Sequence, residues 1–157
     1  QFNNAEYHAH DDSLDHNPMW AVPADCAFPS ATQNEINRVD AVNLLQGGVT
    51  LISEGANMPS TPEAQHEFIE ARILYGPAKA ANAGGVAVSG LEMAQSSQRL
   101  FWSREEVDAK LQEIMKNIHT HCIDASIEFG CEGNYVDGSN IAGFTKVAEA
   151  MLDQGVV

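Results

Sequence analysis

The stretch Lys79-Ala-Ala-Asn-Ala-Gly-Gly-Val-Ala-Val-Ser-Gly-Leu-Glu-Met-Ala-Gln95 carries the most informative pattern in this chain. Gly84 and Gly85 stand where a turn would lead into a helix over residues 86–100. Glycine lets a backbone approach a bound molecule without interference from a Cβ atom, and the first turn of a helix has N–H groups that lack helical partners. The pattern therefore predicts a corner of the fold that faces a ligand.

Three side chains near this turn suit that interpretation. Val86 and Ser89 share one face of the expected helix because they are three residues apart. The Asn82 carboxamide before the turn can both donate and accept hydrogen bonds. Spacing alone leaves a plainer alternative open, because a Gly-Gly pair is usually only a turn and a helical serine usually bonds the carbonyl four residues back or faces water.

Segments of alternating type precede this stretch. Strands are predicted at residues 25–28, 49–53 and 73–75, and helices between them are predicted to begin after the caps Asn37 and Thr61. Strand, helix and strand with such short links are typical of parallel βαβ units. The sequence predicts an α/β fold: part of a Rossmann-like, doubly wound parallel sheet with three strands and their helices, followed by C-terminal helices.

The part of the chain from residue 101 onward is predicted to be helical. The Ser103-x-x-Glu106 signature indicates a capping box, residues 133–138 a loop, and Ser139 or Asn140 the cap of the last helix. Apolar stripes are expected along both helices, at Val107, Leu111, Ile114, Ile118, Ala125 and Phe129, and at Ile141, Phe144, Val147, Ala148 and Met151.

Several runs of letters resemble the hexameric glutamate dehydrogenases. They are the stretch from Asn82 to Gln95, the turn Pro29-Ser-Ala-Thr-Gln-Asn-Glu35, the turn Ser53-Glu-Gly-Ala-Asn-Met-Pro59, and the C-terminus from Asn134 onward. The resemblance covers about residues 20–157, which is the C-terminal third of a family member. Phe28 and Ser30 depart from the family pattern beside the first turn, where leucine and either cysteine or alanine are usual.

The resemblance implies an enzyme that converts L-glutamate to 2-oxoglutarate and ammonia, with NADP or NAD as cofactor. It also implies a homo-oligomer, a hexamer in this family. Each implicated turn follows a predicted strand, so the turns should meet at the carboxyl edge of the sheet, where ligands bind in open α/β folds. The family positions assign cofactor contacts to Ala31, Thr32, Asn57 and Asn82, and the substrate pocket to Val86 and Ser89.

Other family features are absent from this sequence. The Gly-x-Gly-x-x-Gly fingerprint is missing, as is the lysine- and aspartate-bearing substrate domain, and Lys79 matches a different family position. We therefore expect no catalytic residue in this segment, and the chain alone should bind cofactor weakly and turn over nothing. Two interpretations stay open: a C-terminal portion of an active dehydrogenase, or a naturally short, non-catalytic relic that serves as a binding or assembly module.

The predicted organisation is a polar acidic loop or linker over residues 1–18, the C-terminal half of a nucleotide-binding domain over 19–100, and a helical segment over 101–157 that packs on it. The first part contains His8, His10 and His16 with several aspartates, but its spacing defines no metal geometry, so a solvated loop is favoured and no metal is predicted.

Charge and cysteine content exclude several classes of partner. The net charge of −14 disfavours nucleic acid and anionic membranes, and no apolar run is long enough to span a bilayer. The three cysteines lack CxxC spacing, which favours reduced thiols. A cytoplasmic location is expected, with an organelle left open.

Overall fold

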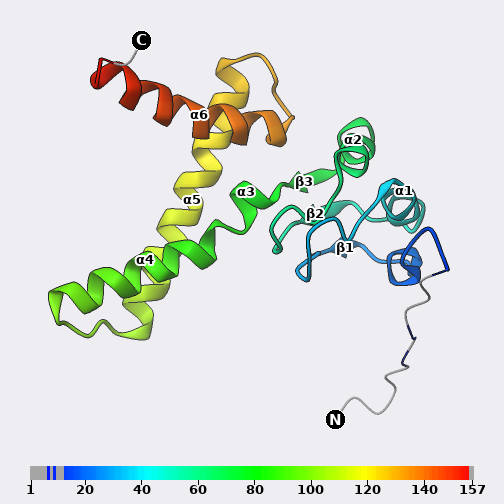
Figure 1. Cartoon of the computed structure of the whole chain (residues 1–157), viewed down its shortest axis with the longest axis horizontal. Coiled ribbons are helices and arrows are strands. Elements are labelled where there is room, and N and C mark those ends of the chain that lie inside the picture. Colours follow the sequence, from blue (N-terminus) through cyan, green and yellow to red (C-terminus); the bar gives the residue numbers. More distant parts are fainter. Residues whose placement is uncertain (1–6, 8, 10–12, 156–157) are drawn as a thin grey trace.

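The computed structural model describes residues 7, 9 and 13–155, and these form an α/β unit followed by a helical arm. Figure 1 shows the α/β unit joined to the arm through β3 and α3. The α/β unit contains η1 (Pro18–Ala21), β1 (Cys26–Ala27), α1 (Arg38–Gln46), β2 (Leu51–Ser53), α2 (Pro62–Glu70) and β3 (Leu74–Gly76). The arm contains α3 (Ala78–Ala81), α4 (Ala83–Gln98), α5 (Arg104–Glu128) and α6 (Tyr135–Asp153).

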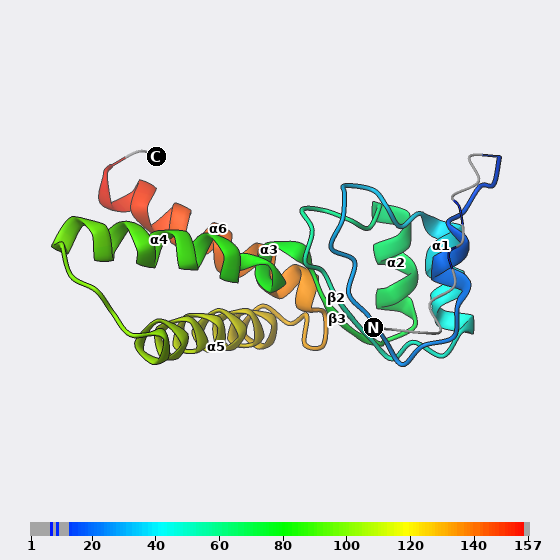
Figure 2. The ribbon, with the colours of Figure 1, turned by 90° about the horizontal axis from the view of Figure 1, so that it is seen from below.

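The three strands form a parallel sheet in the order β1-β2-β3, which confirms the predicted fold class. Figure 2 shows α1 and α2 on one side of this sheet and the arm on the other. Ile52 and Tyr75 face the two helices and are buried, whereas Leu74 faces the arm and is 69% exposed. The core lies between the sheet and the helices and comprises Trp20, Ala27, Ile36, Ala41, Leu44, Val49, Ile52, Ala64, Phe68 and Tyr75.

Predicted caps fix where α1, α2 and α5 begin. The Asn37 side chain accepts hydrogen bonds at the start of α1, and Asp40 completes the capping box. The Thr61 side chain accepts from the Ala64 N–H at the start of α2. Ser103 and Glu106 form the predicted capping box of α5. These starts follow from local hydrogen bonding, which is why the sequence alone locates them.

Two predicted helix starts are wrong. Helix α4 begins at Ala83, so Gly84 and Gly85 lie in its first turn and not in a preceding turn. Helix α6 begins at Tyr135, within the predicted loop, because the Asn134 side chain accepts from the Asp137 N–H. Ser139 and Asn140, which were predicted as caps, lie inside α6, and Asn140 Oδ1 instead accepts a hydrogen bond from Lys79 Nζ of α3.

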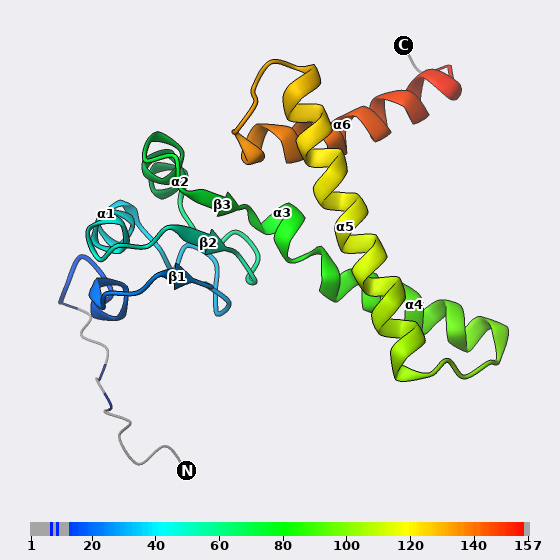
Figure 3. The same cartoon turned by 180° about the vertical axis from the view of Figure 1, so that it is seen from behind.

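Helix α5 is the central helix of the arm, and both α4 and α6 pack against it (Figure 3). Gly84 marks the contact with α4, since a Cβ atom there would lie 3.5 Å from the sulfur of Met115 and 3.6 Å from Leu111. Within the described residues, no helix combines the length and the apolar character needed to cross a membrane.

Candidate functional site

The turns that follow β1 and β2 are bonded to each other at the carboxyl edge of the sheet. The Gly55 and Ala56 N–H groups both donate to the carbonyl oxygen of Pro29, at 2.9 and 3.0 Å. The Asn34 N–H donates to the Met58 carbonyl oxygen at 3.0 Å. Two turns far apart in the sequence therefore form one continuous surface.

Gly55 leaves room for this close contact. A Cβ atom at Gly55 would overlap the Ser30 hydroxyl oxygen and would lie 3.2 Å from the Ser30 Cβ. A larger residue at position 55 would require the Ser30 side chain, or the turn that carries it, to shift. Ser30 also donates its hydroxyl to the Phe28 carbonyl oxygen at 3.0 Å, so its side chain is fixed beside the turn.

Asn82 connects the turn after β2 with the segment after β3. Its Nδ2 donates to the Asn57 Oδ1 at 2.8 Å and to the Ala56 carbonyl oxygen at 3.2 Å. Both donors of the carboxamide are used, so the Asn82 Oδ1 remains as an acceptor without a partner among the described residues. The three post-strand segments thus meet in one place, and two of the predicted cofactor residues touch each other there.

Ala31 and Thr32 lie in the turn after β1 and are exposed. The Ala31 N–H donates to the Glu35 Oε1 at 3.0 Å, which closes this turn on itself. Because Pro29 of the same turn bonds Gly55 and Ala56, the segment is held against the one that carries Asn57.

Val86 and Ser89 lie on α4, one turn apart, and both are exposed. Val86 is 73% exposed, so its apolar side chain is accessible to a ligand. The Ser89 hydroxyl donates to the Gly85 carbonyl oxygen at 3.3 Å. A bond to the carbonyl four residues back is the usual one for a serine within a helix. The bond is long, so the hydroxyl can rotate toward a better acceptor.

Sequence reasoning missed Glu54, which lies directly after β2 and is 1% exposed. Its Oε1 accepts from the Tyr75 hydroxyl and its Oε2 from the Ala78 N–H, both at 2.7 Å. Burial, followed by the negative charge of Glu54, raises the pKa of the Tyr75 hydroxyl. The signal available in the sequence is a carboxylate directly after the apolar predicted strand at residues 49–53, since a buried charge needs dedicated partners.

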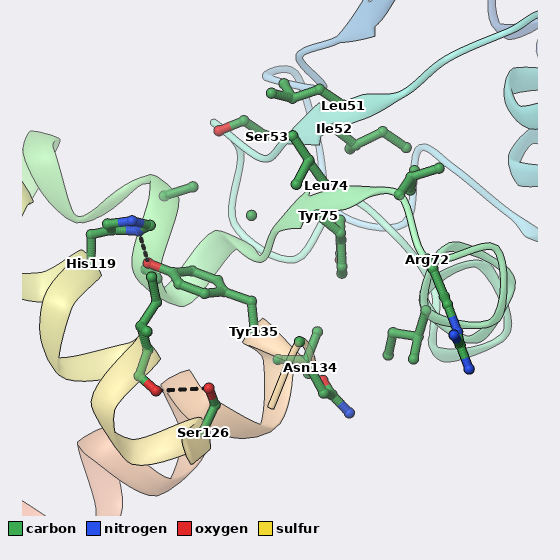
Figure 4. Close-up of a pocket in the computed structure, with 18 of the residues that line it drawn as sticks. Leu51, Ile52, Ser53, Arg72, Leu74, Tyr75, His119, Ser126, Asn134 and Tyr135 are labelled. Atoms are coloured by element: carbon green, nitrogen blue, oxygen red, sulfur yellow. Dashed lines mark hydrogen bonds between the residues drawn. The ribbon is translucent and has the colours of Figure 1, made fainter. Parts of the chain in front are cut away.

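A cavity of about 1140 Å³ lies on the other face of the sheet, between β2–β3 and the arm (Figure 4). Its walls include Leu51, Leu74, Ile118 and Tyr135. None of the six predicted site residues lines it. It is therefore separate from the junction of the turns, and it marks where one face of the sheet lacks a cover within the described chain.

His119 and Cys122 of α5 both lie close to the hydroxyl of Tyr135 in α6. The His119 Nδ1 lies 3.2 Å from the Tyr135 hydroxyl, which links α5 with α6. Burial raises the pKa of the Cys122 thiol and that of the Tyr135 hydroxyl, so both stay protonated near neutral pH. No cluster of three metal-ligating side chains is found in the part of the chain that the structure describes, and His8 and His10 of the N-terminal stretch lie outside it.

Comparison with known proteins identifies relatives. The sequence matches the Glutamate/Leucine/Phenylalanine/Valine dehydrogenase family over residues 1–155. It is 59% identical over 138 residues to the glutamate dehydrogenase of Bacteroides thetaiotaomicron, an alignment that covers 88% of this chain and 31% of that protein. The NADP-specific glutamate dehydrogenase of Haemophilus influenzae is also 59% identical over 138 residues, covering 87% of this chain and 31% of that protein.

A solved structure agrees with the fold. Glutamate dehydrogenase 2 of Plasmodium falciparum matches with a TM-score of 0.82 and 51% sequence identity, covering 91% of this chain and 31% of that chain. This chain therefore spans less than a third of the length of the relatives that it matches. The extent of the family match, together with the junction of three post-strand turns, shows that the chain belongs to the Glutamate/Leucine/Phenylalanine/Valine dehydrogenase family.

Proposed function

We propose that this chain is the C-terminal portion of a glutamate dehydrogenase, which oxidises L-glutamate to 2-oxoglutarate and ammonia with NADP or NAD. The observation that carries the proposal is the Asn57–Asn82 amide pair at the carboxyl edge of a parallel sheet. Relatives named as glutamate dehydrogenases at 59% identity support it. The cofactor preference stays open, because named relatives include NADP-specific and NAD(P)-specific enzymes.

The donor set of the junction fits a nicotinamide cofactor. The unpartnered Asn82 Oδ1 suits the NH₂ group of a carboxamide, and the exposed turns that carry Ala31, Thr32 and Asn57 leave room for a ribose. NAD(P)⁺ supplies a hydride acceptor when it is bound. The residues of this chain bind and orient, and none of them moves a proton.

Val86 and Ser89 would line the pocket for the amino acid. The Ser89 hydroxyl would exchange its long bond to the Gly85 carbonyl for a bond to the side-chain carboxylate of glutamate, because a charged acceptor makes the stronger hydrogen bond. Val86 would exclude water from that pocket with its exposed side chain.

An uncovered sheet face favours a portion of a larger enzyme over a short relic. Parallel sheets are normally covered on both faces. Here α1 and α2 cover one face, while the other borders a cavity of about 1140 Å³ and leaves Leu74 69% exposed. A chain that had evolved to stand alone would be expected to cover this apolar surface. We infer that further polypeptide covers this face. We also infer that the predicted nucleotide-binding part, residues 19–100, and the helical segment, residues 101–157, belong to one larger subunit.

Two measurements on the native protein test the proposal. The intact mass of the subunit should be roughly three times that of 157 residues, as the 31% coverage of relatives implies. The native subunit should reduce NADP⁺ or NAD⁺ only when L-glutamate is present, whereas the 157-residue chain alone should not. A native subunit with the mass of 157 residues and no such activity would favour the relic. A hexameric assembly and a cytoplasmic location are further expectations of the same proposal.

A further inference from the structure

Glu54 is a buried carboxylate without a cation. Among the described residues no lysine, arginine or histidine forms an ion pair with it, and its two oxygens are instead engaged by the Tyr75 hydroxyl and the Ala78 N–H. Its own N–H donates to the Gly76 carbonyl oxygen at 3.0 Å. Burial of a charge in this way is unfavourable unless the geometry of its partners is well defined.

The Ala78 contact places Glu54 at the start of α3. This helix is four residues long, and its N-cap, Pro77, makes no capping hydrogen bond with its side chain. Glu54, which follows the neighbouring strand β2, therefore supplies the hydrogen-bond acceptor that the sequence around Pro77 lacks. Asn82 is the C-cap of the same single turn, roughly 6 Å along the axis, so we expect a shift at Ala78 to move Asn82.

The Asn82 side chain contacts residues 56 and 57, in the same segment as Glu54. Its Nδ2 donates to the Asn57 Oδ1 and to the Ala56 carbonyl oxygen. Residues 54–57 and 78–82 are thus fastened at both ends, by Glu54 with Ala78 at one end and by Asn57 with Asn82 at the other. The orientation of the free Asn82 Oδ1 depends on both fastenings.

We propose that Glu54 is a positioning residue that holds the Asn57–Asn82 amide pair in the orientation needed to seat the nicotinamide end of the cofactor. This rests on the proposed dehydrogenase function. Glu54 is buried, so this role requires no contact with substrate or cofactor. It acts through Tyr75 and through the short helix α3, which begins at Ala78 and ends before Asn82.

Three variants of the native, full-length subunit test this role. Glu54→Ala removes both acceptors, and Glu54→Gln keeps one acceptor for the Ala78 N–H while its NH₂ group can donate to Tyr75. Asp40→Asn is the matched control, because Asp40 is also a buried carboxylate, 2% exposed, but bonds the starts of η1 and α1. Each is examined by crystallography, for the Asn57–Asn82 contact, and by steady-state kinetics normalised to folded subunit.

The proposal expects Glu54→Ala to separate Asn82 from Asn57 and to lower kcat about tenfold or more, while KM for glutamate changes less than about threefold. Glu54→Gln should restore the contact and most of kcat, and Asp40→Asn should leave both unchanged. If Glu54→Ala does not fold, Glu54→Asp shortens the reach by one methylene and should give the same results. An intact amide pair with unchanged kcat, or the same losses in Asp40→Asn, would overturn the proposal. If the unaltered subunit lacks glutamate-dependent activity, the proposed function fails, and the crystallographic contact still decides whether Glu54 positions the pair.

Discussion

Gly138 of α6 lies directly against the carbonyl oxygen of Cys122 in α5. A Cβ atom at this position would overlap that oxygen and would lie 3.0 Å from the Cβ of Ser126. Because the obstacle is helix backbone, no side-chain rotation can relieve it. The two helices cross this closely only because residue 138 has no side chain.

Gly138→Ala should therefore lower the free energy of unfolding by about 1–3 kcal/mol through overpacking at the crossing. The matched control is Gly143→Ala, in the same helix, where an added Cβ would meet nothing within 4 Å. That change should raise the free energy of unfolding by up to about 1 kcal/mol, since alanine is the better helix former. Urea denaturation of both variants gives the comparison, and equal effects at the two positions would contradict the crossing geometry.

Gly138 also explains why the loop predicted over residues 133–138 is wrong. Residues 133–138 have two glycines and an aspartate, a composition typical of a loop, yet α6 begins at Tyr135 and Gly138 is buried within it. Gly138 is needed for a contact with a helix that lies earlier in the chain, and local propensity carries no information about such a contact. The caps at Asn37, Thr61 and Ser103 were predictable because their hydrogen bonds are made within the next few residues.

The apolar stripes were predicted only in part. Ala125 is buried as expected, but Phe129 is 57% exposed and Phe144 is 68% exposed. Periodicity indicates which face of a helix is apolar, and it does not indicate what covers that face. The junction of Asn57 with Asn82 could be expected from the rule for parallel sheets, whereas the Glu54 contacts depend on side-chain reach across two strands.

Asp40→Ala should destabilise the α/β unit more than an ordinary capping change. Asp40 is 2% exposed and accepts from the Asn17 N–H at 2.7 Å as well as from the Asn37 N–H at 3.1 Å. Its removal leaves two backbone donors without partners, so we expect a loss of about 2 kcal/mol in the free energy of unfolding.

The control is Glu106→Ala, which breaks the equivalent capping box of α5 at a fully exposed position. Water can replace the lost acceptor there, so its effect in the same denaturation experiment should be clearly smaller. A loss as large as that of Asp40→Ala would show that burial does not set the difference.

Tyr75 should make stability sensitive to alkaline pH. Burial and the charge of Glu54 raise the pKa of its hydroxyl in the folded protein above the value of about 10 in the unfolded chain. The unfolded state then loses its proton first, so this contribution to the free energy of unfolding is complete below about pH 10 and is lost as pH rises further. Thermal or urea unfolding from about pH 8 to about pH 11 measures the slope.

Tyr75→Phe should remove this share of the alkaline slope, leaving that of Tyr135, whose hydroxyl pKa is also raised by burial. At neutral pH it should cost about 1–3 kcal/mol, because the Glu54 Oε1 loses its donor. Tyr7→Phe is the control, since Tyr7 is 88% exposed, and it should leave the profile unchanged. An unaltered slope in Tyr75→Phe would argue against the buried Tyr75–Glu54 contact.

Ser89 and Ser97 form a matched pair on α4 that tests the substrate pocket. Both hydroxyls donate to the carbonyl oxygen four residues earlier, Ser89 to Gly85 at 3.3 Å and Ser97 to Met93 at 2.8 Å. In the native subunit, Ser89→Ala should raise KM for glutamate by roughly 10- to 100-fold, because a hydrogen bond to a charged group contributes about 1.5–3 kcal/mol. Ser97→Ala, two turns farther along the helix, should leave KM unchanged. If neither variant changes KM, the long Ser89 bond is only a local helix contact, and Ser89 does not hold the glutamate carboxylate.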